Sequence, residues 1–515
     1  MSFKIRSFLA ISALLVLFGC DKSGGGNDNQ PPQAKIKATH TSYLEGDNWI
    51  LDAKESFDPD GTIKKYEWSV DSALVSDDDS IYLSSLKPGK HLIKLKVWDD
   101  EGAIDSTQKE LDVPNVCSSV DAKKDRIFKI MRRDYLWYKN VPSTPPKNTR
   151  TLGEFLDKLT YKKYDKWSYI ESKQAYNDYF NNSTYIGIGV SFSFVDDKVF
   201  VRFVYDNSPA SEANLKRGDE ILKINGKTIK EISENRSWST IFGENKEGVK
   251  VSMEIKTKEG ETKTLELTKR KINAKSVLIS KVIKLEDGKK IGYLHFLSFV
   301  NPSKDELLNS FRYFRDQNID ELVLDLRYNG GGLVSIAALL GSLIGGDKVD
   351  QKDFATLKFN DLNTKFNYTY KFESTGIDLD LSRVFVLTSH STCSASELVI
   401  NGLKPFLDVI VIGDRTCGKP VGMSGIEVCD YILNAINFAT YNANNQGEYF
   451  DGIEAQCYVK DNLFVDLGSL DEPLLKEALN YIQTQECSSR NSKIIDTINK
   501  TPQIYKGFRR ELGAF

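Results

Sequence analysis

The sequence predicts a multidomain protein in which a β-rich domain comes first, an α/β domain comes last, and a helical segment lies between them. The chain has 515 residues, which is more than one hydrophobic core usually contains. Strand-like alternation is concentrated in residues 33–114, and helical spacing in residues 115–185. Apolar, β-rich runs that end in turns or glycines recur through residues 273–487.

The composition is that of a soluble chain with several domains. The formal net charge is −3, and hydrophobic residues make up 40% of the chain. Because no basic surface stands out, nucleic acid is not expected among the partners. Glycines 330–332 do not form a phosphate-binding loop, because the Lys and Ser or Thr that close such a loop do not follow them. No cofactor is expected.

The N-terminus is predicted to export the protein. Lys4 and Arg6 precede an apolar run over residues 8–18 that is too short to span a bilayer comfortably, which is typical of a signal peptide. The run closes on LFGC, which resembles a bacterial lipobox and implies that Cys20 is lipidated. We therefore predict a lipoprotein signal peptide and lipobox over residues 1–20, a flexible tether over residues 21–32, and a lipid-anchored protein of the bacterial cell envelope, periplasmic or at the cell surface. An uncleaved anchor helix is the alternative.

Residues 33–114 are predicted to form a β-sandwich. Residues 58–61 (DPDG) are a strong turn signal, and residues 92–98 alternate in part as a strand does. The segment SFDPDGTI, followed closely by YEW, resembles the immunoglobulin-like domains of PKD type, which implies a spacer or a binding module. Asp58 and Asp60 could hold calcium, but two carboxylates in a turn are more often solvated, so no metal site is expected.

Residues 115–185 are predicted to be mostly helical. Two runs of apolar residues fall near helical spacing, and the second repeats the pattern of the first. These residues are Ile127, Ile130, Met131 and Tyr135, then Leu152, Phe155 and Leu159. Trp137 and Trp167 are most simply core residues.

Residues 186–272 resemble a PDZ domain. NSPA at residues 207–210 leads to GDEILKINGK at residues 218–227. The resemblance implies that a peptide adds a strand to a sheet edge and that backbone N–H groups of a glycine-containing loop capture its terminal carboxylate. The candidate peptide-binding residues are Gly187, Ile188, Gly189 and Val190. The alternative is that the two glycines only relieve crowding at the start of a strand.

Ser394 and Lys419 each follow an apolar, β-rich run. Residues 384–387 precede the turn that leads to Ser394, and residues 409–413 precede the loop that carries Lys419. The ends of adjacent strands are where α/β proteins build sites. A serine hydroxyl becomes a nucleophile when a base takes its proton, and a lysine can be that base when burial or nearby positive charge keeps it neutral.

Each of these residues also has a simpler interpretation. Residues 394–397 (SASE) form a capping box that would open a helix, and a lysine in a loop is usually solvated. The two roles of Ser394 are compatible, because a helix start has free N–H groups that can stabilise an oxyanion. The apolar run at residues 321–326 ends in glycines 330–332, where a second such donor could lie.

These segments resemble the core of the C-terminal processing, or tail-specific, serine proteases. The matching blocks occur in the family's order at residues 291–296, 325–332, 391–397 and 413–419. Ser394 and Lys419 are 25 residues apart, a spacing similar to that of the family's Ser/Lys pair.

The resemblance implies a fold and a chemistry. Residues 273–487 would form an α/β protease core with a mixed sheet of the ClpP/crotonase-like type, and the substrates would be proteins or peptides with accessible C-termini. Ser394 would be the nucleophile and Lys419 the general base of a serine endopeptidase. The oxyanion hole would be formed by the backbone N–H groups of Ala395 and of Gly331 or Gly332.

Two positions depart from the family pattern. Met423 stands where a glutamine commonly orients the dyad, and a thioether cannot donate a hydrogen bond. Pro420 replaces a residue that is often glycine and stiffens the loop. The alternative function is therefore a catalytically weak or inactive peptide-binding lipoprotein on the same fold.

Six cysteines remain when Cys20 is set aside, an even number that makes disulfides plausible in an exported protein. Cys393 and Cys417 border the proposed catalytic residues, so a bond to either would fix the local geometry. A cysteine protease that uses Cys393 with His390 is a less favoured alternative. A zinc site is disfavoured, because the chain has only four histidines and no paired CxxC spacing.

The C-terminal part is predicted to contain one helix followed by a polar tail. Residues 474–482 have the pattern of an amphipathic helix, and the tail over residues 488–515 is polar.

Overall fold

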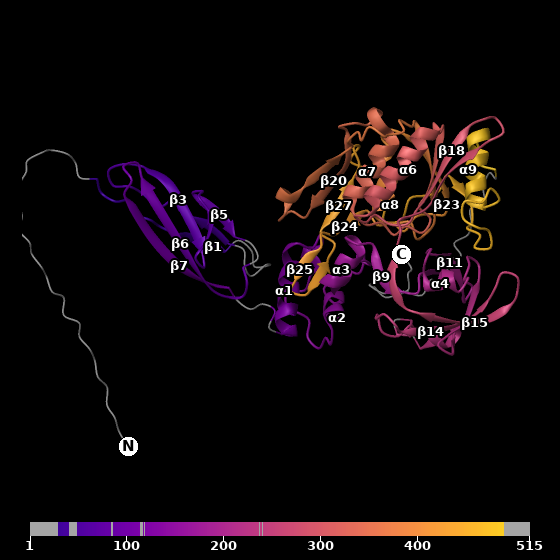
Figure 1. Cartoon of the computed structure of the whole chain (residues 1–515), viewed down its shortest axis with the longest axis horizontal. Helices are drawn as coiled ribbons and strands as arrows, with labels where there is room; N and C mark the ends of the chain where they lie inside the picture. Colours follow the sequence, from indigo (N-terminus) through magenta and orange to yellow (C-terminus); the bar gives the residue numbers. More distant parts are fainter. Residues whose placement is uncertain are drawn as a thin grey trace, which may run out of the picture. The chain divides into compact units, whose positions relative to one another are not determined.

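The structure is a computed structural model that describes residues 29–40, 49–83, 86–113, 117, 119–235, 237–238 and 240–488. The predicted signal peptide, Cys20, most of the tether and the tail beyond residue 488 lie outside the described residues. The chain divides into two compact units, Met1–Asn115 and Val116–Phe515, which we describe separately (Figure 1). Within the described ranges, no helix is long and apolar enough to cross a membrane.

The first unit is a sandwich of two antiparallel sheets. One sheet has the order β1-β2-β5 and the other the order β4-β3-β6-β7. The strands are β1 (Lys37–His40), β2 (Trp49–Asp52), β3 (Ile63–Val70), β4 (Ala73–Ser76), β5 (Ser80–Leu83), β6 (Gly89–Asp99) and β7 (Ile104–Val113). In β6 the side chains of Ile93, Leu95 and Val97 are buried against Trp68 of β3, while the lysines between them face outward. This period of two is what a sheet with one buried face requires.

The second unit begins with a segment that is helical only in part. Its elements are α1 (Val120–Arg133), η1 (Tyr138–Asn140), α2 (Leu152–Asp157), β8 (Tyr169–Ser172), α3 (Lys173–Phe180) and β9 (Thr184–Gly187). The strands β8 and β9 were not expected from the helical pattern. They form because β8 pairs with β26 (Tyr431–Asn434) and β9 pairs with β16 (Arg270–Asn273), partners that are remote in the sequence.

A disulfide also ties this segment to the rest of the unit. Cys117 is bonded to Cys429, which lies between β25 (Ile426–Val428) and β26 and is 312 residues further along the chain. The helical segment is therefore joined to the same β-hairpin by a covalent bond and by the pairing of β8.

A small α+β domain follows. Its sheet has the order β10-β11-β12-β14-β15, and the short β13 pairs with β12. The elements are β10 (Val190–Val195), β11 (Lys198–Val204), α4 (Pro209–Glu212), β12 (Glu220–Ile224), β13 (Lys227–Thr228), α5 (Ile229–Glu234), β14 (Lys250–Lys256) and β15 (Thr262–Thr268). Because β10 is an edge strand, one side of its backbone is open to pairing in the described part of the sheet.

The α/β domain is built on a six-stranded mixed sheet with the order β17-β18-β19-β22-β23-β28. Its strands are β17 (Val277–Lys284), β18 (Lys290–Phe296), β19 (Glu321–Asp325), β22 (Arg383–Thr388), β23 (Asp408–Gly413) and β28 (Cys457–Tyr458). The pair β17/β18 is antiparallel and the other pairs are parallel.

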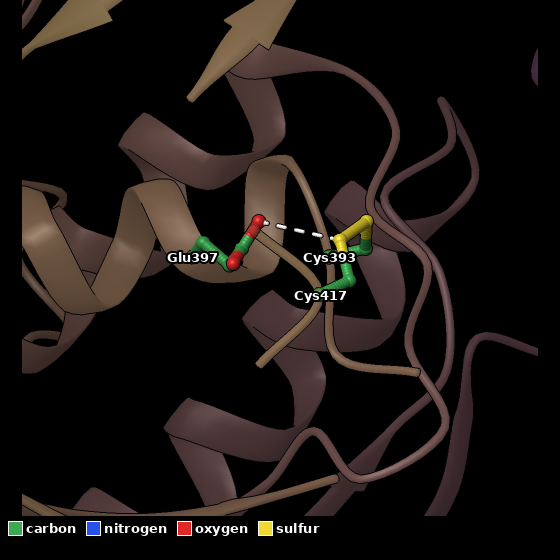
Figure 2. Close-up of side chains that lie close together, drawn as sticks. All are labelled: Cys393, Glu397 and Cys417. Carbon is green, nitrogen blue, oxygen red and sulfur yellow. Dashed lines mark hydrogen bonds between the residues drawn. A yellow bond between two sulfur atoms is a disulfide. The ribbon is translucent and has the colours of Figure 1, made fainter. Parts of the chain in front are cut away.

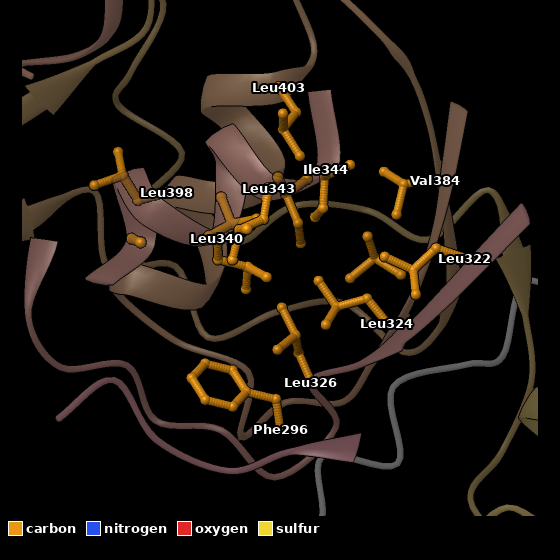
Figure 3. Packing of buried hydrophobic residues seen from close by; sticks show 14 of the residues in the cluster. Phe296, Leu322, Leu324, Leu326, Leu340, Leu343, Ile344, Val384, Leu398 and Leu403 are labelled. Carbon is orange, nitrogen blue, oxygen red and sulfur yellow. The ribbon is translucent and has the colours of Figure 1, made fainter. Parts of the chain in front are cut away.

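Helices cover both faces of this sheet, as apolar strands in a parallel arrangement require. The helices α6 (Ser303–Gln317), α7 (Val334–Gly345) and α8 (Ala395–Leu403) pack on one face, where Leu324, Val384 and Leu340 belong to the same buried cluster (Figure 3). The amphipathic pattern near the C-terminus forms α9 (Pro473–Thr484), which packs on the opposite face against Phe385 (Figure 1).

A second, smaller sheet lies beside this core and carries one of the loops of the site. Its order is β21-β20-β27-β24. Its strands are β20 (Asp353–Phe359), β21 (Tyr368–Lys371), β24 (Val421–Gly422) and β27 (Phe438–Tyr441). Since β24 begins two residues after Lys419, this sheet holds the end of the lysine loop.

Candidate active site

Ser394 stands between β22 and α8 in a backbone conformation that residues with a Cβ rarely adopt. Its φ is 58° and its ψ is −116°. Such strain costs about 1–3 kcal/mol and persists only where the surroundings impose it. Thr392 contributes to this, because its hydroxyl donates to the Leu326 carbonyl (2.8 Å) and accepts from the Ser389 N–H (2.9 Å). The half-buried Ser394 side chain is thereby presented at the start of a helix.

Asn329 organises the glycine loop against the Ser394 turn. Its side chain is buried, and its Nδ2 donates to the Phe296 carbonyl (3.0 Å). Its own carbonyl accepts from the Cys393 N–H (3.0 Å) and the Ser396 hydroxyl (3.0 Å). Asn329 was not among the predicted site residues, although its place directly before three glycines could have indicated it.

The glycines are required by close approach of the backbone to Ser394. A Cβ on Gly331 would lie 2.8 Å from the Ala395 nitrogen and from the Ser394 Cβ, and the φ of Gly331 is +100°. A Cβ on Gly332 would lie 2.1 Å from the Phe299 carbonyl oxygen. No other residue type fits either position without displacement.

The predicted oxyanion donors differ in their availability. The Gly331 N–H donates to Asn329 Oδ1 at 2.9 Å, so it is occupied in this conformation. For the N–H groups of Gly332 and Ala395, no acceptor lies among the described residues. These two donors fit the requirement of an oxyanion site better than Gly331 does.

One buried carboxylate, Glu397, binds the backbone on both sides of the candidate dyad. Its Oε2 accepts from the N–H of Ser394 (2.8 Å) and of Lys419 (2.9 Å). Its Oε1 accepts from the Gly418 N–H (2.8 Å) and the Thr416 hydroxyl (2.5 Å). Burial raises the pKa of Glu397, and the donated hydrogen bonds partly offset this. The nitrogens of Ser394 and Lys419 therefore lie within two hydrogen-bond lengths of each other.

A disulfide between Cys393 and Cys417 closes the same arrangement (Figure 2). The two Cα atoms are 5.2 Å apart, and one cysteine directly precedes Ser394 while the other lies two residues before Lys419. The disulfide that was expected to fix this region therefore joins Cys393 to Cys417. The alternative of a Cys393 nucleophile is wrong for this structure, because the Cys393 sulfur is bonded and His390 is exposed.

The Cys393–Cys417 disulfide also determines whether these two sulfurs can act as metal ligands. Cys393, Glu397 and Cys417 place their ligand atoms within 4.8 Å of one another. The sulfurs are joined to each other, however, and the carboxylate oxygens already accept hydrogen bonds from four donors. A disulfide sulfur has no charge with which to bind a metal ion.

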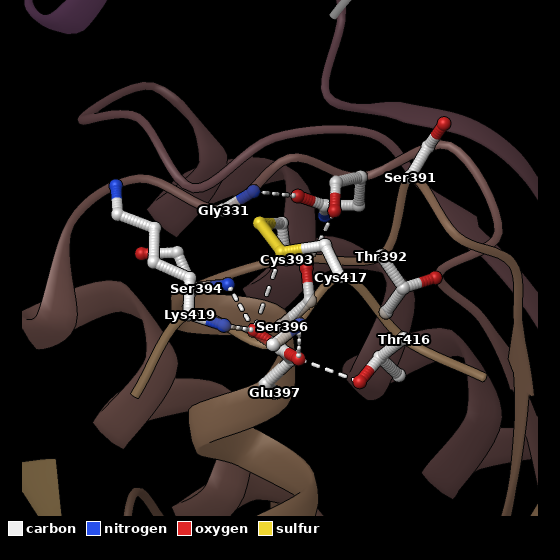
Figure 4. Close-up of a disulfide and its surroundings, with 12 residues drawn as sticks. Gly331, Ser391, Thr392, Cys393, Ser394, Ser396, Glu397, Thr416, Cys417 and Lys419 are labelled. Atoms are coloured by element: carbon white, nitrogen blue, oxygen red, sulfur yellow. Dashed lines mark hydrogen bonds between the residues drawn. A yellow bond between two sulfur atoms is a disulfide. The ribbon is translucent and has the colours of Figure 1, made fainter. Parts of the chain in front are cut away.

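Lys419 lies in the loop between β23 and β24. Its side chain is half-buried, and its Nζ lies 5.9 Å from the ring centroid of Trp167. Figure 4 shows the side chains of Ser394 and Lys419 on the same side of the Glu397 carboxylate. Pro420 anchors the end of the loop, since its carbonyl accepts from the Thr440 N–H and hydroxyl at 3.0 Å each. Trp167, expected to be a core residue, is half-buried instead.

The candidate peptide-binding residues lie where β9 leads into β10. The carbonyls of Ile188 and Gly189 accept from the N–H groups of Ala210 and Tyr205, at 2.9 Å each. Gly189 has a φ of +79°, and a Cβ there would lie 2.1 Å from the Ser208 Cβ. Crowding therefore explains Gly189 by itself, which is the alternative that the sequence left open.

A charged network joins the α+β domain to the α/β domain close to the glycine loop. Arg217, which precedes the GDEIL segment, donates to Asp461 (2.9 Å) and to the Tyr328 hydroxyl (2.8 Å). Tyr328 also donates to Asp461, and it directly precedes Asn329. These contacts could not be predicted from local patterns, because Arg217 and Asp461 are 244 residues apart.

The network continues into the sheet through Arg327, whose side chain is completely buried. Arg327 pairs with Asp325 (2.6 Å), Glu472 (2.6 Å) and Asp461 (3.0 Å). Burial opposes ionisation of Asp325, but Arg327, together with His295 and the Tyr293 hydroxyl, lowers the pKa of that carboxyl to about 2. The strand that leads to the glycine loop is thus held by ion pairs.

Fold and site together define a class of protein. A serine at the start of a helix, a glycine loop beside it and a PDZ-like domain are features of PDZ-containing serine peptidases. Residues 290–459 match Peptidase family S41, residues 122–169 match the Peptidase S41 N-terminal domain, and residues 187–268 match the PDZ domain. These matches support the S41 family of C-terminal processing proteases, with a PDZ domain, for this part of the chain.

Curated relatives agree with this class. The chain is 26% identical over 300 residues to "Probable CtpA-like serine protease" of Staphylococcus aureus. This match covers 58% of this chain and 56% of the relative. It thus spans about half the length of these relatives. It is also 25% identical over 390 residues to "Carboxy-terminal processing protease CtpB" of Bacillus subtilis, covering 73% of this chain and 77% of that protein.

A solved structure gives the same result for the fold. The crystal structure of a "Putative S41 protease" from Bacteroides fragilis is 27% identical to this chain, with a TM-score of 0.56. The match covers 70% of this chain and 97% of that one.

Proposed function

We propose that this protein is a serine endopeptidase in which Ser394 is the nucleophile and Lys419 the general base. One observation carries the proposal: the same Glu397 oxygen accepts hydrogen bonds from the backbone of both residues, at 2.8 Å and 2.9 Å. The Cys393–Cys417 disulfide clamps the same two loops. The geometry of the pair is thus fixed through the main chain, which reduces the need for the glutamine that Met423 replaces.

The proposed reaction has two stages. Ser394 Oγ attacks the substrate carbonyl carbon while its proton passes to Lys419 Nζ, and the oxyanion accepts from the N–H groups of Ala395 and Gly332. The C–N bond then breaks, the leaving amine takes the proton from Lys419, and an ester on Ser394 remains. Water attacks this ester, giving its proton to Lys419, and Ser394 leaves with that proton restored.

The substrates are proteins or peptides with accessible C-termini. The edge strand β10 can pair with an extended peptide, and the residues Gly187, Ile188, Gly189 and Val190 adjoin it, where backbone N–H groups can bind a terminal carboxylate. The proposed PDZ-like domain covers residues 186–272, and the proposed catalytic core, of the ClpP/crotonase-like type, covers residues 273–487.

The N-terminal part gives the enzyme its place in the cell. The signal peptide and lipobox over residues 1–20 would direct export and lipidation, and the lipid on Cys20 would anchor the protein to a membrane of the bacterial cell envelope. The β-sandwich of the first unit would then serve as a PKD-type spacer or binding module. The polar tether over residues 21–32 would let the enzyme stand away from the lipid surface.

The second candidate function is peptide binding with weak or no cleavage, favoured by Met423, whose thioether cannot donate a hydrogen bond to orient the dyad. Cleavage of an unstructured protein by wild type, Ser394→Ala and Lys419→Ala distinguishes the two. We expect wild type to cut and each variant to lose at least about 10³-fold in kcat, as removal of a nucleophile or its base does. Equal inertness of all three, with retained binding of C-terminal peptides, would favour the binding function instead.

A further inference from the structure

The Cys393–Cys417 disulfide lies against the carboxylate that joins the two halves of the candidate dyad. The Cys417 sulfur is 3.6 Å from Glu397 Oε2 (Figure 2). The same oxygen accepts from the N–H groups of Ser394 and Lys419. A disulfide sulfur carries no proton, so it donates no hydrogen bond to this oxygen. The redox state of the bond therefore decides whether a further donor lies beside Glu397.

The Glu397 carboxylate has no acceptor site left for such a donor. A carboxylate offers about four lone-pair sites. Two backbone N–H groups use those of Oε2, and the Gly418 N–H and the Thr416 hydroxyl use those of Oε1. Reduction would give Cys417 an S–H group, which would be a fifth donor, and loss of that proton would place a second negative charge beside the carboxylate. In either form, reduced Cys417 competes with the contacts that hold the candidate dyad.

Reduction should displace the lysine loop more than the segment of Cys393. Cys393 is 4% exposed, and a Cβ on Gly331 would lie 2.8 Å from its carbonyl oxygen, so its surroundings are closely packed. Cys417 is half-buried, and its N–H donates to the Thr392 carbonyl at 3.0 Å. Two thiol sulfurs repel each other at bonding distance, so one of the side chains must move when the bond is reduced. The partly exposed Cys417 has room to do so, and it lies two residues before Lys419.

We propose that the Cys393–Cys417 bond is a redox switch: Ser394 is activated when the bond is formed and is not when both cysteines are thiols. This role rests on the function proposed above. The bond forms by exchange with the disulfide of an oxidant: the Cys417 thiolate attacks it and releases one thiolate, and the Cys393 thiolate then attacks the Cys417 sulfur and releases the second. Two electrons pass to the oxidant, which becomes a dithiol, and each cysteine loses its proton. A protein made with thiols would thus stay inactive until it reaches a compartment where disulfides form.

The test compares oxidised protein with protein reduced by dithiothreitol. Two rates are measured: hydrolysis of an unstructured protein substrate that has no cysteines, and covalent labelling of Ser394 by a fluorophosphonate, in which the serine oxygen bonds to phosphorus and fluoride leaves. Alkylation of free thiols, followed by mass spectrometry, gives the state of each cysteine pair. The variants are Cys393→Ala/Cys417→Ala and Cys393→Ala, which keeps the second thiol. The matched control is Cys457→Ala/Cys487→Ala, because that disulfide joins β28 to the residues after α9.

We expect reduction of wild type to lower kcat and the labelling rate on the order of 10-fold to 100-fold, the loss expected from a misplaced catalytic group. Reoxidation should restore both rates. Cys393→Ala/Cys417→Ala should be slow with or without reductant, whereas the control pair should behave as wild type in both states. Cys393→Ala should be slower than the double variant, because its Cys417 thiol competes for Glu397. Equal rates for these two variants would overturn the part assigned to Glu397.

Three further outcomes would count against the switch. An active wild type whose rates are unchanged when Cys393 and Cys417 are both thiols would overturn the switch alone. A loss on reduction that disappears in Cys457→Ala/Cys487→Ala would overturn it as well, because the effect would then belong to another bond. An oxidised wild type as inert as Ser394→Ala in both assays would overturn the proposed function and the switch with it. If the Cys393→Ala/Cys417→Ala variant does not fold, reversible reduction of wild type and of the control pair still decides between these outcomes.

Discussion

Two carboxylates in the second unit, Glu397 and Asp325, are both completely buried, yet their surroundings are opposite. Neutral backbone and hydroxyl donors surround Glu397, whereas Arg327 binds Asp325. Burial raises the pKa of Glu397, and its neutral donors offset this only in part, whereas the surroundings of Asp325 lower the pKa of that carboxyl to about 2.

The difference shows two ways of fixing a loop. In the network around Arg327, opposite charges hold a strand to its neighbours. Removal of either ion-pair partner leaves the other charge buried without a counter-ion. At the site, a single carboxylate gathers main-chain N–H groups from two loops without a second charge.

The largest expected effect comes from breaking the network. Arg327→Met would leave Asp325 and Glu472 buried without their cation, so we expect a loss of about 3–5 kcal/mol in the free energy of unfolding. Urea unfolding of the second unit measures this. The control is Arg315→Met, because Arg315 is nearly half-exposed and its ion pair with Asp316 is a surface one. A loss as small as that of the control would show that the ion pairs contribute little net stability.

A smaller effect on stability, but a specific effect on activity, is expected from Glu397→Gln. An amide presents one oxygen and one NH₂ group, so two of the four donors lose their acceptor, at a cost of about 1–3 kcal/mol. Because the loops of Ser394 and Lys419 then separate, kcat should fall on the order of 100-fold. Hydrolysis of a protein substrate and thermal unfolding are measured together.

The matched control for this variant is Glu477→Gln. Glu477 is also buried, and it accepts from the Ser488 N–H (2.8 Å) and the Ser488 hydroxyl, far along the chain from the dyad. It should lose similar stability and keep wild-type kcat. If Glu397→Gln keeps wild-type kcat as well, the role of Glu397 in joining the two loops is refuted.

The smallest expected effect is a pair of opposite pH dependences. The pKa of Asp325 falls from 3.8 to about 2 on folding, so its contribution to stability is complete above about pH 4 and is lost as the pH falls toward 2. The pKa of Glu397 rises above 4.5 on folding, so stability is gained as the pH falls toward 4.5 and lost as the pH rises through the raised value.

Urea unfolding of wild type, Asp325→Asn and Glu397→Gln between pH 2 and pH 7 measures both dependences. The difference between wild type and Asp325→Asn should shrink below pH 4. Relative to Glu397→Gln, wild type should become more stable on acidification toward pH 4.5. If the stability differences between wild type and the two variants changed with pH in the same direction, the contrast drawn between Asp325 and Glu397 would be wrong.

Features with a local cause could be predicted from the sequence. The capping box at residues 394–397 marks the start of α8, and the apolar runs at residues 384–387 and 409–413 became β22 and β23. The pattern at residues 474–482 became α9 for the same reason. In each case the hydrogen bonds or the periodicity involve residues only a few positions apart.

Features with a remote cause could not be predicted. Glu397 was seen only as a capping residue, because its contacts with Thr416, Gly418 and Lys419 depend on a loop 19 to 22 residues away. The strand β8 was missed because its partner β26 is remote in the sequence. Trp167 was assigned to a core on its residue type alone, and only the fold brings it near Lys419.

The disulfide between Cys117 and Cys429 has a mechanical consequence. A force applied to the chain on the N-terminal side of Cys117 is transmitted through the disulfide bond to the β25–β26 turn, which carries Cys429. The two cysteines are 312 positions apart, and the segment between them, which contains α1, the PDZ-like domain and the Ser394 helix, is bypassed by this force. Tension on the N-terminus would therefore leave the geometry of Ser394 undisturbed until the β25–β26 hairpin itself gives way.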